Sequence, residues 1–467
     1  MRGTGRLFLW RGRLRGGQRL VRILFCGLRP IRAQRLMSLA IGRSGQHSRA
    51  RLLCLIALIG LPLPGGATEI RGSGYIKYFA TAIDPPVVNG KDGPTEGASL
   101  SRARLRLLLE RRPISVELAY ELASRIEPAG SGALGGFGDA LAQSLPRPSP
   151  LAYRAVDLRR RLYPSPGDAV SSFSLRQNLD RLLVTWSAAA FDVYAGRQPI
   201  AFGSARIVNP TDVLAPFTYE ELDKEERIGV DSLRLRFPLG DLSELDAGYV
   251  FGDDLKWSRS AAFVRSRLYV STTDVSPLIL FFRRHLLIGL DLARAIRGAG
   301  WWLETGYIFA DDDAYASDAG EGDYLRLSTG LDYSLSPALY GLLEYHYSDA
   351  GSGSSAGYLQ RAGRTAFVDG GVYLQGRHYL APAATWQVTP LLVVTGQGLV
   401  NLQDRSSLVG PRLEYSFADE VFLELGAFVG IGEGLVSVKD TPEADLYARS
   451  EFGLYPNTFF GSLRLYF

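Results

Sequence analysis

The feature that most constrains this chain is a regular alternation of charged and apolar side chains. Residues 101–107 read Ser-Arg-Ala-Arg-Leu-Arg-Leu, residues 231–237 read Asp-Ser-Leu-Arg-Leu-Arg-Phe, and residues 323–328 read Asp-Tyr-Leu-Arg-Leu-Ser. Successive side chains of a β-strand point to opposite faces, so each segment predicts a strand with one polar and one apolar face. Arginines at every second position exclude the inner face of a β-sandwich, which is apolar. They predict a sheet with lipid on one side and water on the other.

The rest of the chain follows the same period of two. No uninterrupted apolar run after residue 67 is long enough for a transmembrane helix, and the nearest, Pro277–Phe282, is followed by two arginines. Segments of about ten residues alternate in polarity between turn residues, which is typical of membrane-spanning strands. A soluble solenoid or sandwich array is the alternative, but the sequence shows neither a repeat nor apolar inner faces.

The connections between these segments alternate in length. Short turns are expected at residues 111–113, 188–189, 240–241, 297–298, 336–337, 389–390 and 418–419, and longer polar loops at 83–98, 127–176, 200–229, 252–259, 311–322, 348–375 and 431–456. We therefore predict an all-β fold, a transmembrane antiparallel up-and-down β-barrel of about 18 strands (16–18), over residues 68–467. In two parts of the chain few turn residues mark where strands end: residues 272–290, where two strands meet, and residues 368–379, which have room for another strand pair.

The chain ends on a strand, Thr458–Phe467, whose odd-numbered positions are mostly apolar. A closed barrel must pair its last strand with its first, because an open edge in lipid leaves backbone groups without partners. With this ending the chain resembles bacterial outer-membrane β-barrels, whose assembly machinery reads a C-terminal strand ending in Phe. The resemblance implies the outer membrane of a Gram-negative cell as the location. It also implies lipid, lipopolysaccharide and, through the strand ending in Phe467, the barrel-assembly machinery as partners.

Residues 1–67 are expected to be removed from the mature protein. They contain 13 Arg and no Lys, Asp or Glu, and the apolar run Leu52–Leu63 precedes small residues that end at Ala67. This pattern indicates an N-terminal extension and a secretory signal peptide cleaved after Ala67, and Met37 would give a conventional start. An arginine-rich mitochondrial presequence is the alternative. Cys54 lacks a convincing lipoprotein cleavage context, so no lipid anchor is expected.

Removing this segment reverses the sign of the net charge. The whole chain carries a net charge of +4, whereas residues 68–467 contain 39 Lys and Arg against 48 Asp and Glu. The basic charge therefore belongs to the leader, and nucleic-acid binding loses its main support. Both cysteines also precede residue 68, which excludes a disulfide framework, a thiolate nucleophile and a cysteine metal site from the mature chain.

With the apolar residues of each strand facing lipid, the other face lines a lumen. The basic positions on that face are Lys77, Arg102, Arg104, Arg106, Arg181, Arg234, Arg236, Arg265, Arg267, Arg326, Arg412 and Arg464. The acidic positions are Glu117, Glu121, Asp192, Glu244, Asp246, Asp291, Glu304, Asp332, Glu344, Glu414 and Glu424. Most of the bases precede residue 268, which predicts a basic wall that steers an anionic or polyhydroxylated solute. The alternative is that these charges pair with one another and only keep the lumen wet.

One local motif is more specific than the alternation. The strand that contains Gly196-Arg197-Gln198 is followed by Asn209-Pro210-Thr211-Asp212. Over about 180–240 the chain resembles a group of proteobacterial porin-like barrels, similar in style to alginate-export porins, in which a Gly-Arg-Gln strand runs into an Asn-Pro-x-Asp loop. The resemblance implies passage of a solute through the outer membrane and does not identify the solute.

The loop at residues 200–229 is the candidate constriction. Its prolines stiffen the chain, and Asp212 can bond its own backbone in a turn. We expect Arg197, Asn209, Asp212 and Phe217 to belong to a loop that folds inward and narrows the pore; the alternative is a structural loop packed on the wall. Arg197 falls on the outward parity of its strand, so it is expected either at the polar rim or re-aimed by a β-bulge.

Catalysis and metal binding have little support. The mature chain holds only three histidines, and Glu344, His346 and Ser348 share one face of one strand, where they lie side by side and do not converge. No nucleophile elbow, zinc spacing or phosphate loop is present in the sequence. The acidic residues 311–323 fit either a Ca²⁺ site or, more simply, a solvated loop tip. We expect no catalytic residues, no metal and no cofactor.

The sequence therefore predicts an outer-membrane pore or channel for a small hydrophilic solute, anionic or saccharide, with a charged lumen narrowed by an inward loop. A non-conducting structural or adhesion barrel is the alternative, and an outer-membrane hydrolase is the weaker one. The loop at residues 127–176 is expected to be either mobile or a plug, and its basic stretch 159–161 to lie over the mouth.

Overall fold

The computed structural model describes residues 68–87, 90, 93–126, 153–168, 172–311, 322–361, 363–437 and 446–467. The expected leader, residues 1–67, lies outside this part. The chain divides into two compact units, one formed by Met1–Arg71 with Leu109–Arg112 and the other by Gly72–Leu108 with Pro113–Phe467. In the described part of the first unit, Arg71 pairs with Glu69 and Glu110. The second unit is the barrel, and everything below concerns it.

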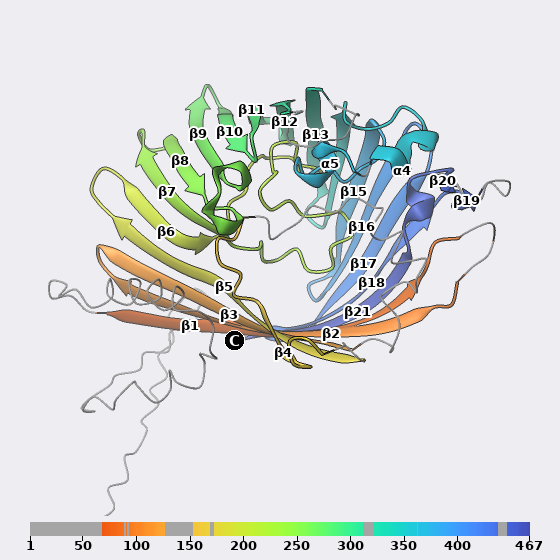
Figure 1. Ribbon diagram of the computed structural model, residues 1–467, viewed down its shortest axis with the longest axis horizontal. Coiled ribbons are helices and arrows are strands. Elements are labelled where there is room, and N and C mark those ends of the chain that lie inside the picture. Colours follow the sequence, from red (N-terminus) through yellow and green to blue (C-terminus); the bar gives the residue numbers. More distant parts are fainter. Residues whose placement is uncertain are drawn as a thin grey trace, which may run out of the picture. The chain divides into compact units, whose positions relative to one another are not determined.

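The barrel wall is one antiparallel sheet, seen in Figure 1. The described residues give a 19-stranded sheet, in which the four-residue β4 (Arg160–Tyr163) only extends β5, so that eighteen strands make the wall. These strands are β1 (Glu69–Asp84), β2 (Glu96–Arg111), β3 (Ile114–Ile126), β5 (Phe173–Ser187), β6 (Asp192–Gln198), β7 (Val230–Pro238), β8 (Glu244–Val250), β9 (Ala261–Val270), β10 (Thr273–Phe282), β11 (His285–Ile296), β12 (Ala299–Phe309), β13 (Tyr324–Ser336), β14 (Leu339–Ser348), β15 (His378–Thr389), β16 (Leu392–Asn401), β17 (Ser407–Ala418), β18 (Val421–Ile431) and β21 (Asn457–Tyr466). The predicted fold class and strand number are confirmed.

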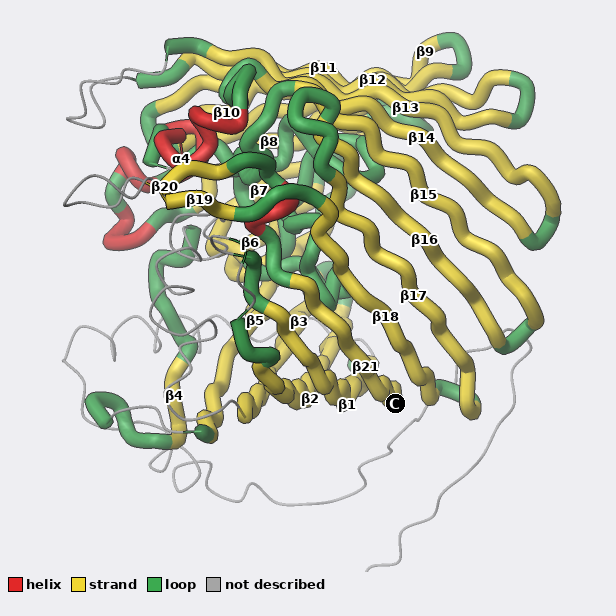
Figure 2. The backbone as a smooth tube through the Cα atoms, turned by 90° about the vertical axis from the view of Figure 1, so that its right-hand side faces the viewer, coloured by secondary structure: helices red, strands yellow, loops and turns green. Residues whose placement is uncertain are grey.

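The last strand closes the barrel on the first. β21 pairs with β1 from Tyr75↔Tyr466 to Asp84↔Asn457, and its other edge pairs with β18. The predicted role of the C-terminal strand in closing the barrel is thus confirmed. In Figure 2 the strands run obliquely across the wall, as a closed sheet with staggered register requires. Among the described residues, no helix is long and apolar enough to cross a membrane.

The predictions for the two segments with few turn residues, 272–290 and 368–379, differ in how they compare with the structure. Residues 272–290 contain β10 and β11, joined at Arg283 and Arg284, which both have positive φ and so form a tight turn. The possible strand pair at residues 368–379 was wrong. This segment follows the short helix α5 (Thr365–Val368) and contains no strand before β15 begins at His378.

The outer face of the barrel is apolar along its strands. On β10, for example, Ile279 and Phe281 are about half exposed, while the alternating Leu278, Leu280 and Phe282 point inward and are buried. A continuous band of exposed apolar side chains on a closed sheet is stable only when lipid covers it. The barrel therefore spans a membrane.

The inward apolar residues correct one expectation. The sequence predicted a wall with water on its inner face, but one end of the lumen is filled by loops that pack against apolar wall residues. Two buried clusters result, and they join wall residues such as Leu280 and Leu399 to loop residues such as Phe202, Phe367 and Phe452. The charged side chains occupy the rest of the lumen.

Three long connections supply these loops, and all lie at the end of the barrel opposite the short turns. They are residues 199–229, residues 349–377 with η4 (Ser355–Gly357), α4 (Tyr358–Arg361) and α5, and residues 432–456 with β19 (Leu435–Ser437), β20 (Leu446–Ala448) and η5 (Phe452–Leu454). A smaller loop at this end carries η1 (Asp253–Leu255) and η2 (Trp257–Arg259). Figure 1 shows the yellow-green segment after β6 crossing the interior of the barrel.

Candidate functional site

The loop between β6 and β7, residues 199–229, lies inside the barrel and is bound to the wall at both ends. Its first half docks on Glu304 of β12, whose side chain is fully buried. The backbone N–H groups of Ala205 and Thr211 donate to the Glu304 carboxylate at 3.0 and 2.8 Å, and the Thr211 hydroxyl donates at 2.7 Å. Asn209, one of the expected constriction residues, donates through Nδ2 at 3.2 Å. One carboxylate thus accepts hydrogen bonds from three residues of the loop, Ala205, Asn209 and Thr211.

A second buried carboxylate, Glu344 of β14, binds the segment between these donors. The N–H groups of Arg206 and Val208 donate to its two oxygens at 2.7 and 2.8 Å, and Ile207 donates at 3.2 Å. The indole of Trp302 also donates to Glu344, at 3.0 Å. Because ionised acceptors make the strong hydrogen bonds of proteins, the two glutamates hold the loop backbone without a basic side chain.

Close backbone approach makes this docking possible. Gly203 has φ +87, and a Cβ at that position would overlap both carboxylate oxygens of Glu304. Only glycine adopts this conformation without strain and leaves room for the carboxylate. The Arg326 guanidinium, predicted to line the pore, instead donates to the carbonyls of Asn209 and Gly370, so it fastens two loops to β13.

The second half of the loop binds the opposite, basic wall. Lys77 of β1 is fully buried and pairs with Asp223 at 2.9 Å and with Glu225. Arg102 of β2 pairs with Asp223 at 2.9 Å, and Arg104 reaches Glu226 at 3.4 Å. The loop therefore spans the lumen from β12–β14 to β1 and β2.

Arg104 and Arg181 belong to a denser buried cluster around Asp180. Arg104 pairs with Asp180 at 3.0 Å and with Glu121 at 2.7 Å, while Arg181 pairs with Asp180 and donates to the carbonyl of Arg227. A register shift opposite Ala119 and Tyr120 places Asp180 and Arg181 together on the inner side.

Within the loop, Asp212 and Phe217 both contact Arg227. The guanidinium of Arg227 binds the Asp212 carboxylate, donates to the carbonyl of Ala215 at 2.9 Å and stacks on the ring of Phe217. Burial raises the pKa of Asp212, and the Arg227 cation opposes that rise. These contacts fix the shape of the loop around Asp212, which is buried, and Phe217, which is partly buried.

Arg197 is the penultimate residue of β6, next to the loop at residues 199–229. It is buried, donates to Asp231 through Nε at 2.7 Å, and donates to the carbonyls of Leu179 and Val156 at 2.8 and 2.6 Å. Gly196, with φ +118, precedes it. Arg197 therefore fastens the segment after residue 152 to the wall and does not face the lumen.

That segment is the described end of the loop at residues 127–176, of which residues 127–152 and 169–171 lie outside the described part. Tyr153 packs in the buried cluster with Phe202, and Arg154 donates to Asn178, Asp180 and the carbonyl of Gly229. Burial lowers the pKa of Arg154 to about 10. The basic stretch is exposed, with Arg159 paired to Asp157.

The remaining bases predicted to line the pore have acidic neighbours on the wall. Arg106 pairs with Glu117 at 2.8 Å, and Arg267 reaches Glu244 at 3.4 Å. Asp246 receives both Arg234 and Arg265, at 2.5 and 2.9 Å. Arg236 lies over the ring of Tyr194, 5.3 Å from its centroid. The geometry thus agrees with the alternative interpretation of the lumen charges, in which most of them pair.

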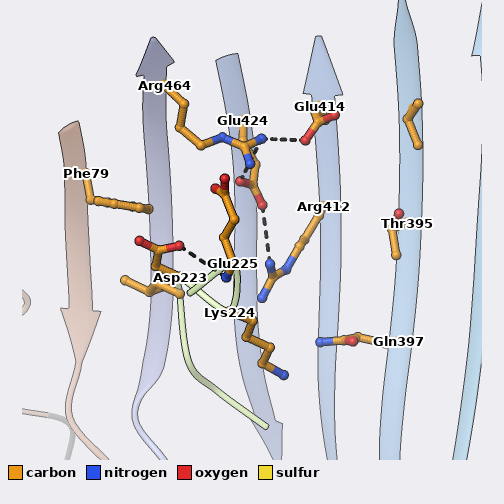
Figure 3. A pocket seen from close by; sticks show the side chains of 12 residues that line it. Phe79, Asp223, Lys224, Glu225, Thr395, Gln397, Arg412, Glu414, Glu424 and Arg464 are labelled. Carbon is orange, nitrogen blue, oxygen red and sulfur yellow. Dashed lines mark hydrogen bonds and ion pairs between the residues drawn. The ribbon is translucent and has the colours of Figure 1, made fainter. Parts of the chain in front are cut away.

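An open cavity lies in the lumen beside the loop, and Figure 3 shows the residues that line it. It has a volume of about 370 Å³ and lies between loop residues 222–225 and the wall of β16, β17, β18 and β21. Its polar lining consists of Asp223, Lys224, Glu225, Thr395, Gln397, Arg412, Glu414, Glu424 and Arg464. The alternation predicted the four charged wall residues, but not Lys224 or the loop carboxylates, since nothing in a loop sequence states which wall it reaches.

Two of the three inward loops, residues 349–377 and residues 432–456, are joined to each other at a second buried carboxylate cluster. Glu451 is fully buried and accepts from the N–H of Gln375 at 2.7 Å, from Asn401 at 2.8 Å and from the Tyr379 hydroxyl. Asp404 accepts from the Glu451 N–H at 2.7 Å and from the Tyr358 hydroxyl at 3.0 Å. Burial raises the pKa of Glu451 to about 7.

The side chains considered for catalysis are buried under the loop. His346 shares a hydrogen bond of 2.8 Å with Ser328, whose hydroxyl donates to the carbonyl of Val208 at 2.6 Å, while Glu344 is occupied by loop N–H groups. Ser348 is fully buried on the same strand face. Of the acidic residues 311–323, residues 312–321 lie outside the described part.

Comparison with known proteins gives structural similarity only. No protein-family model and no curated protein sequence matches the chain. OccAB4 of Acinetobacter baumannii superimposes with a TM-score of 0.49 at 10% identity, covering 87% of this chain and 100% of that one. OpdK of Pseudomonas aeruginosa, in a structure with vanillate, gives a TM-score of 0.49 at 10% identity, covering 85% and 98%. OccD3 (OpdP) of Pseudomonas aeruginosa gives 0.45 at 8% identity, covering 85% and 91%.

Proposed function

We propose that the protein is an outer-membrane pore through which a small hydrophilic solute passes, and that the loop at residues 199–229 is its constriction. The observation that carries the proposal is the position of this loop: it crosses the lumen, with Glu304 and Glu344 binding one half and Lys77 and Arg102 binding the other. A loop fixed on both walls sets a constant width for the passage beside it.

Barrel size and lumen chemistry support the proposal. A closed barrel of eighteen strands encloses more space than its own wall side chains fill, and barrels of 16–18 strands leave an aqueous channel. The inner face next to the short turns carries charged residues such as Arg106, Asp246, Glu414 and Arg464. Water and polar solutes wet such a surface. A closed apolar-coated barrel of this kind belongs to outer membranes.

The paired wall sets the solute class. Because most bases have acidic partners, the lumen has many hydrogen-bonding groups and little uncompensated charge. Such a surface suits a small polar solute, an anion or a saccharide included. Charges that are paired and exposed to water in this way would give the pore only modest selectivity between anions and cations.

A non-conducting structural barrel is the second candidate, and one observation favours it. The three inward loops form two buried apolar clusters with the wall, which close much of one end of the lumen. A hydrolase is disfavoured by the burial of Ser328 and His346 beneath the loop backbone.

The test is conductance in planar lipid bilayers. We expect discrete channels from the intact protein and a larger unit conductance after residues 205–225 are deleted. Deleting residues 253–259, an exposed loop at the same end of the barrel, serves as the control and is expected to leave conductance unchanged. Absence of channels in the intact protein would favour the structural barrel, whereas equal conductance after both deletions would show that the loop is no constriction.

We also propose that residues 1–67 are a cleaved leader and that the strand ending in Phe467 binds the barrel-assembly machinery. Sequencing the N-terminus of protein recovered from outer membranes tests the first point, because cleavage after Ala67 leaves Thr68 first. Crosslinking from position 466 during assembly tests the second. Lipopolysaccharide as a further partner follows from the proposed location in the outer leaflet.

A further inference from the structure

The cavity beside the constriction has its charges separated toward two ends. Figure 3 shows Lys224, Arg412 and Gln397 at one end, and Glu225, Glu414 and Glu424 with Arg464 at the other. The walls come from four strands of the C-terminal part of the barrel, and only Phe79 and the loop residues come from elsewhere. Its position next to the loop places it along the proposed passage.

The basic end has donors with unused capacity. Lys224 donates to the carbonyl of Tyr219 at 3.0 Å, which leaves two of its three protons for another acceptor. Arg412 makes only long contacts, 3.4 Å to Glu424 and 3.5 Å to the carbonyl of Glu221, and its buried Nε has no partner among the described residues. The side-chain amide of Gln397 faces the same space and makes no hydrogen bond to the described residues.

The basic end is held by aromatic rings and partial burial. The Arg412 guanidinium lies over the rings of Phe428 and Phe460, at 5.2 and 5.5 Å from their centroids. Burial lowers the pKa of Lys224 to about 8, with the Arg412 cation as the next cause. Two cations that repel each other in a partly buried space are stabilised by an anion placed between them.

The acidic end has acceptors with unused capacity. Glu414 binds Arg464 through one oxygen, and Glu225 binds Lys77 and the Tyr466 hydroxyl through one oxygen. Their other carboxylate oxygens have no partner among the described residues, and both side chains are about 40% exposed. With Asp223 and Glu424 included, four carboxylates face three cations here, Lys77, Arg102 and Arg464. Because Glu424 also contacts Arg412 of the basic end, at 3.4 Å, the acceptors that this end offers to a solute are the second oxygens of Glu225 and Glu414.

We propose that this cavity is a binding site for a small zwitterion, with its carboxylate toward Lys224 and Arg412 and its ammonium group toward Glu225 and Glu414. The inference rests on the proposed function for its place in a passage, but not for binding itself. A simple anion would satisfy the basic end and be repelled by the acidic end, and a simple cation would do the reverse. Only a solute with both charges pairs the unused groups at both ends.

The test compares three small solutes of similar size: L-serine, glycerate, which has a hydroxyl in place of the ammonium group, and ethanolamine, which lacks the carboxylate. Binding to the detergent-solubilised full-length protein is measured by titration calorimetry at pH 7. We expect L-serine to bind at least tenfold more tightly than either analogue, since each lost charged hydrogen bond costs about a factor of ten or more.

Variants assign the two ends. Lys224→Gln is expected to weaken L-serine and glycerate about tenfold and to leave ethanolamine unchanged. Glu414→Gln is expected to weaken L-serine and ethanolamine and to spare glycerate. The controls are Lys256→Gln, an exposed lysine outside the barrel lumen, and Asp274→Asn, an exposed carboxylate at an inward position of β10, and neither is expected to change any affinity.

The outcomes separate this site from the pore. Binding of L-serine with the expected variant pattern, without channels in bilayers, would support the site and refute the pore. Channels with equal affinity for L-serine and glycerate would support the pore and refute the zwitterion site. An L-serine affinity that falls equally in Glu414→Gln and Asp274→Asn would also refute the site, because it would show a general effect of lumen charge.

Discussion

The docking of the constriction loop on Glu344 makes a prediction whose size follows from the structure. Three loop N–H groups and the Trp302 indole donate to this carboxylate. Hydrogen bonds to a charged group contribute about 1.5–3 kcal/mol each, so that four give about 6 kcal/mol at the lower bound. In Glu344→Ala, water that enters the space of the removed side chain restores part of these hydrogen bonds. We therefore expect the free energy that holds the loop on the wall to fall by about 3 kcal/mol. A loss of about 3 kcal/mol raises the open fraction of the loop about a hundredfold.

Cysteine labelling measures this opening directly. Val208 belongs to the loop and is buried where the loop docks on the wall, so Val208→Cys reacts with a thiol reagent only when the loop leaves the wall. The native cysteines, Cys26 and Cys54, are first replaced by Ser. We expect Glu344→Ala to raise the labelling rate of Val208→Cys about a hundredfold and to raise single-channel conductance.

The matched control is Glu117→Ala, which removes a lumen carboxylate that pairs with Arg106 on the wall and does not touch the loop. It is expected to leave the labelling rate within about twofold of the parent. Heat-dependent migration in electrophoresis checks that each barrel is folded. If Glu344→Ala labelled no faster than Glu117→Ala in folded barrels, the carboxylate would not hold the loop and the reasoning would be refuted.

Three other predictions follow from single features. Gly203→Ala places a Cβ against Glu304 at a positive φ and is expected to raise the labelling of Val208→Cys by at least tenfold. Gly240→Ala also has a positive φ, but its Cβ meets open space in a short turn, so it is expected to leave the labelling rate of Val208→Cys unchanged. Because burial raises the pKa of Glu451 to about 7, the free energy that this cluster contributes is complete below about pH 4.5 and is lost by pH 7, about 3 kcal/mol in all. The hydrogen-exchange protection factor of the Gln375 N–H is therefore expected to fall across this range, and to stay level in Glu451→Gln. Deleting residues 457–467 removes the partner of both β1 and β18 and is expected to abolish the heat-modifiable folded form.

The fold was predictable because its determinants are local. A period of two needs only neighbouring residues, and the alternation of short and long connections needs only the turn residues between them. The strands around Arg102, Arg234 and Arg326 were identified in this way. The segment at residues 368–379 failed because its alternating residues belong to an inward loop, whose burial by other loops is not encoded in its own pattern.

The site was predictable only in part, because its contacts are distant in sequence. Asn209 and Asp212 were identified from their motif, but Glu304 and Glu344 appeared only as lumen acids, without the backbone donors that they bind. Arg197 was expected to belong to the constriction loop, and it instead fastens the segment beginning at Tyr153. Parity places a side chain on a face, whereas its partner depends on which loop folds back over it.

The loop at residues 199–229 also imposes an order on the assembly of the barrel. Arg206 meets a partner 138 residues later in the chain, at Glu344, and Asp223 meets one 146 residues earlier, at Lys77. The second half binds strands that precede the loop, whereas the first half can dock only after β12 and β14 have been added, because contacts of such separation form late. The growing sheet must therefore form around a loop whose first half is not yet docked. When β21 finally pairs with β1, the closed sheet encloses the loop.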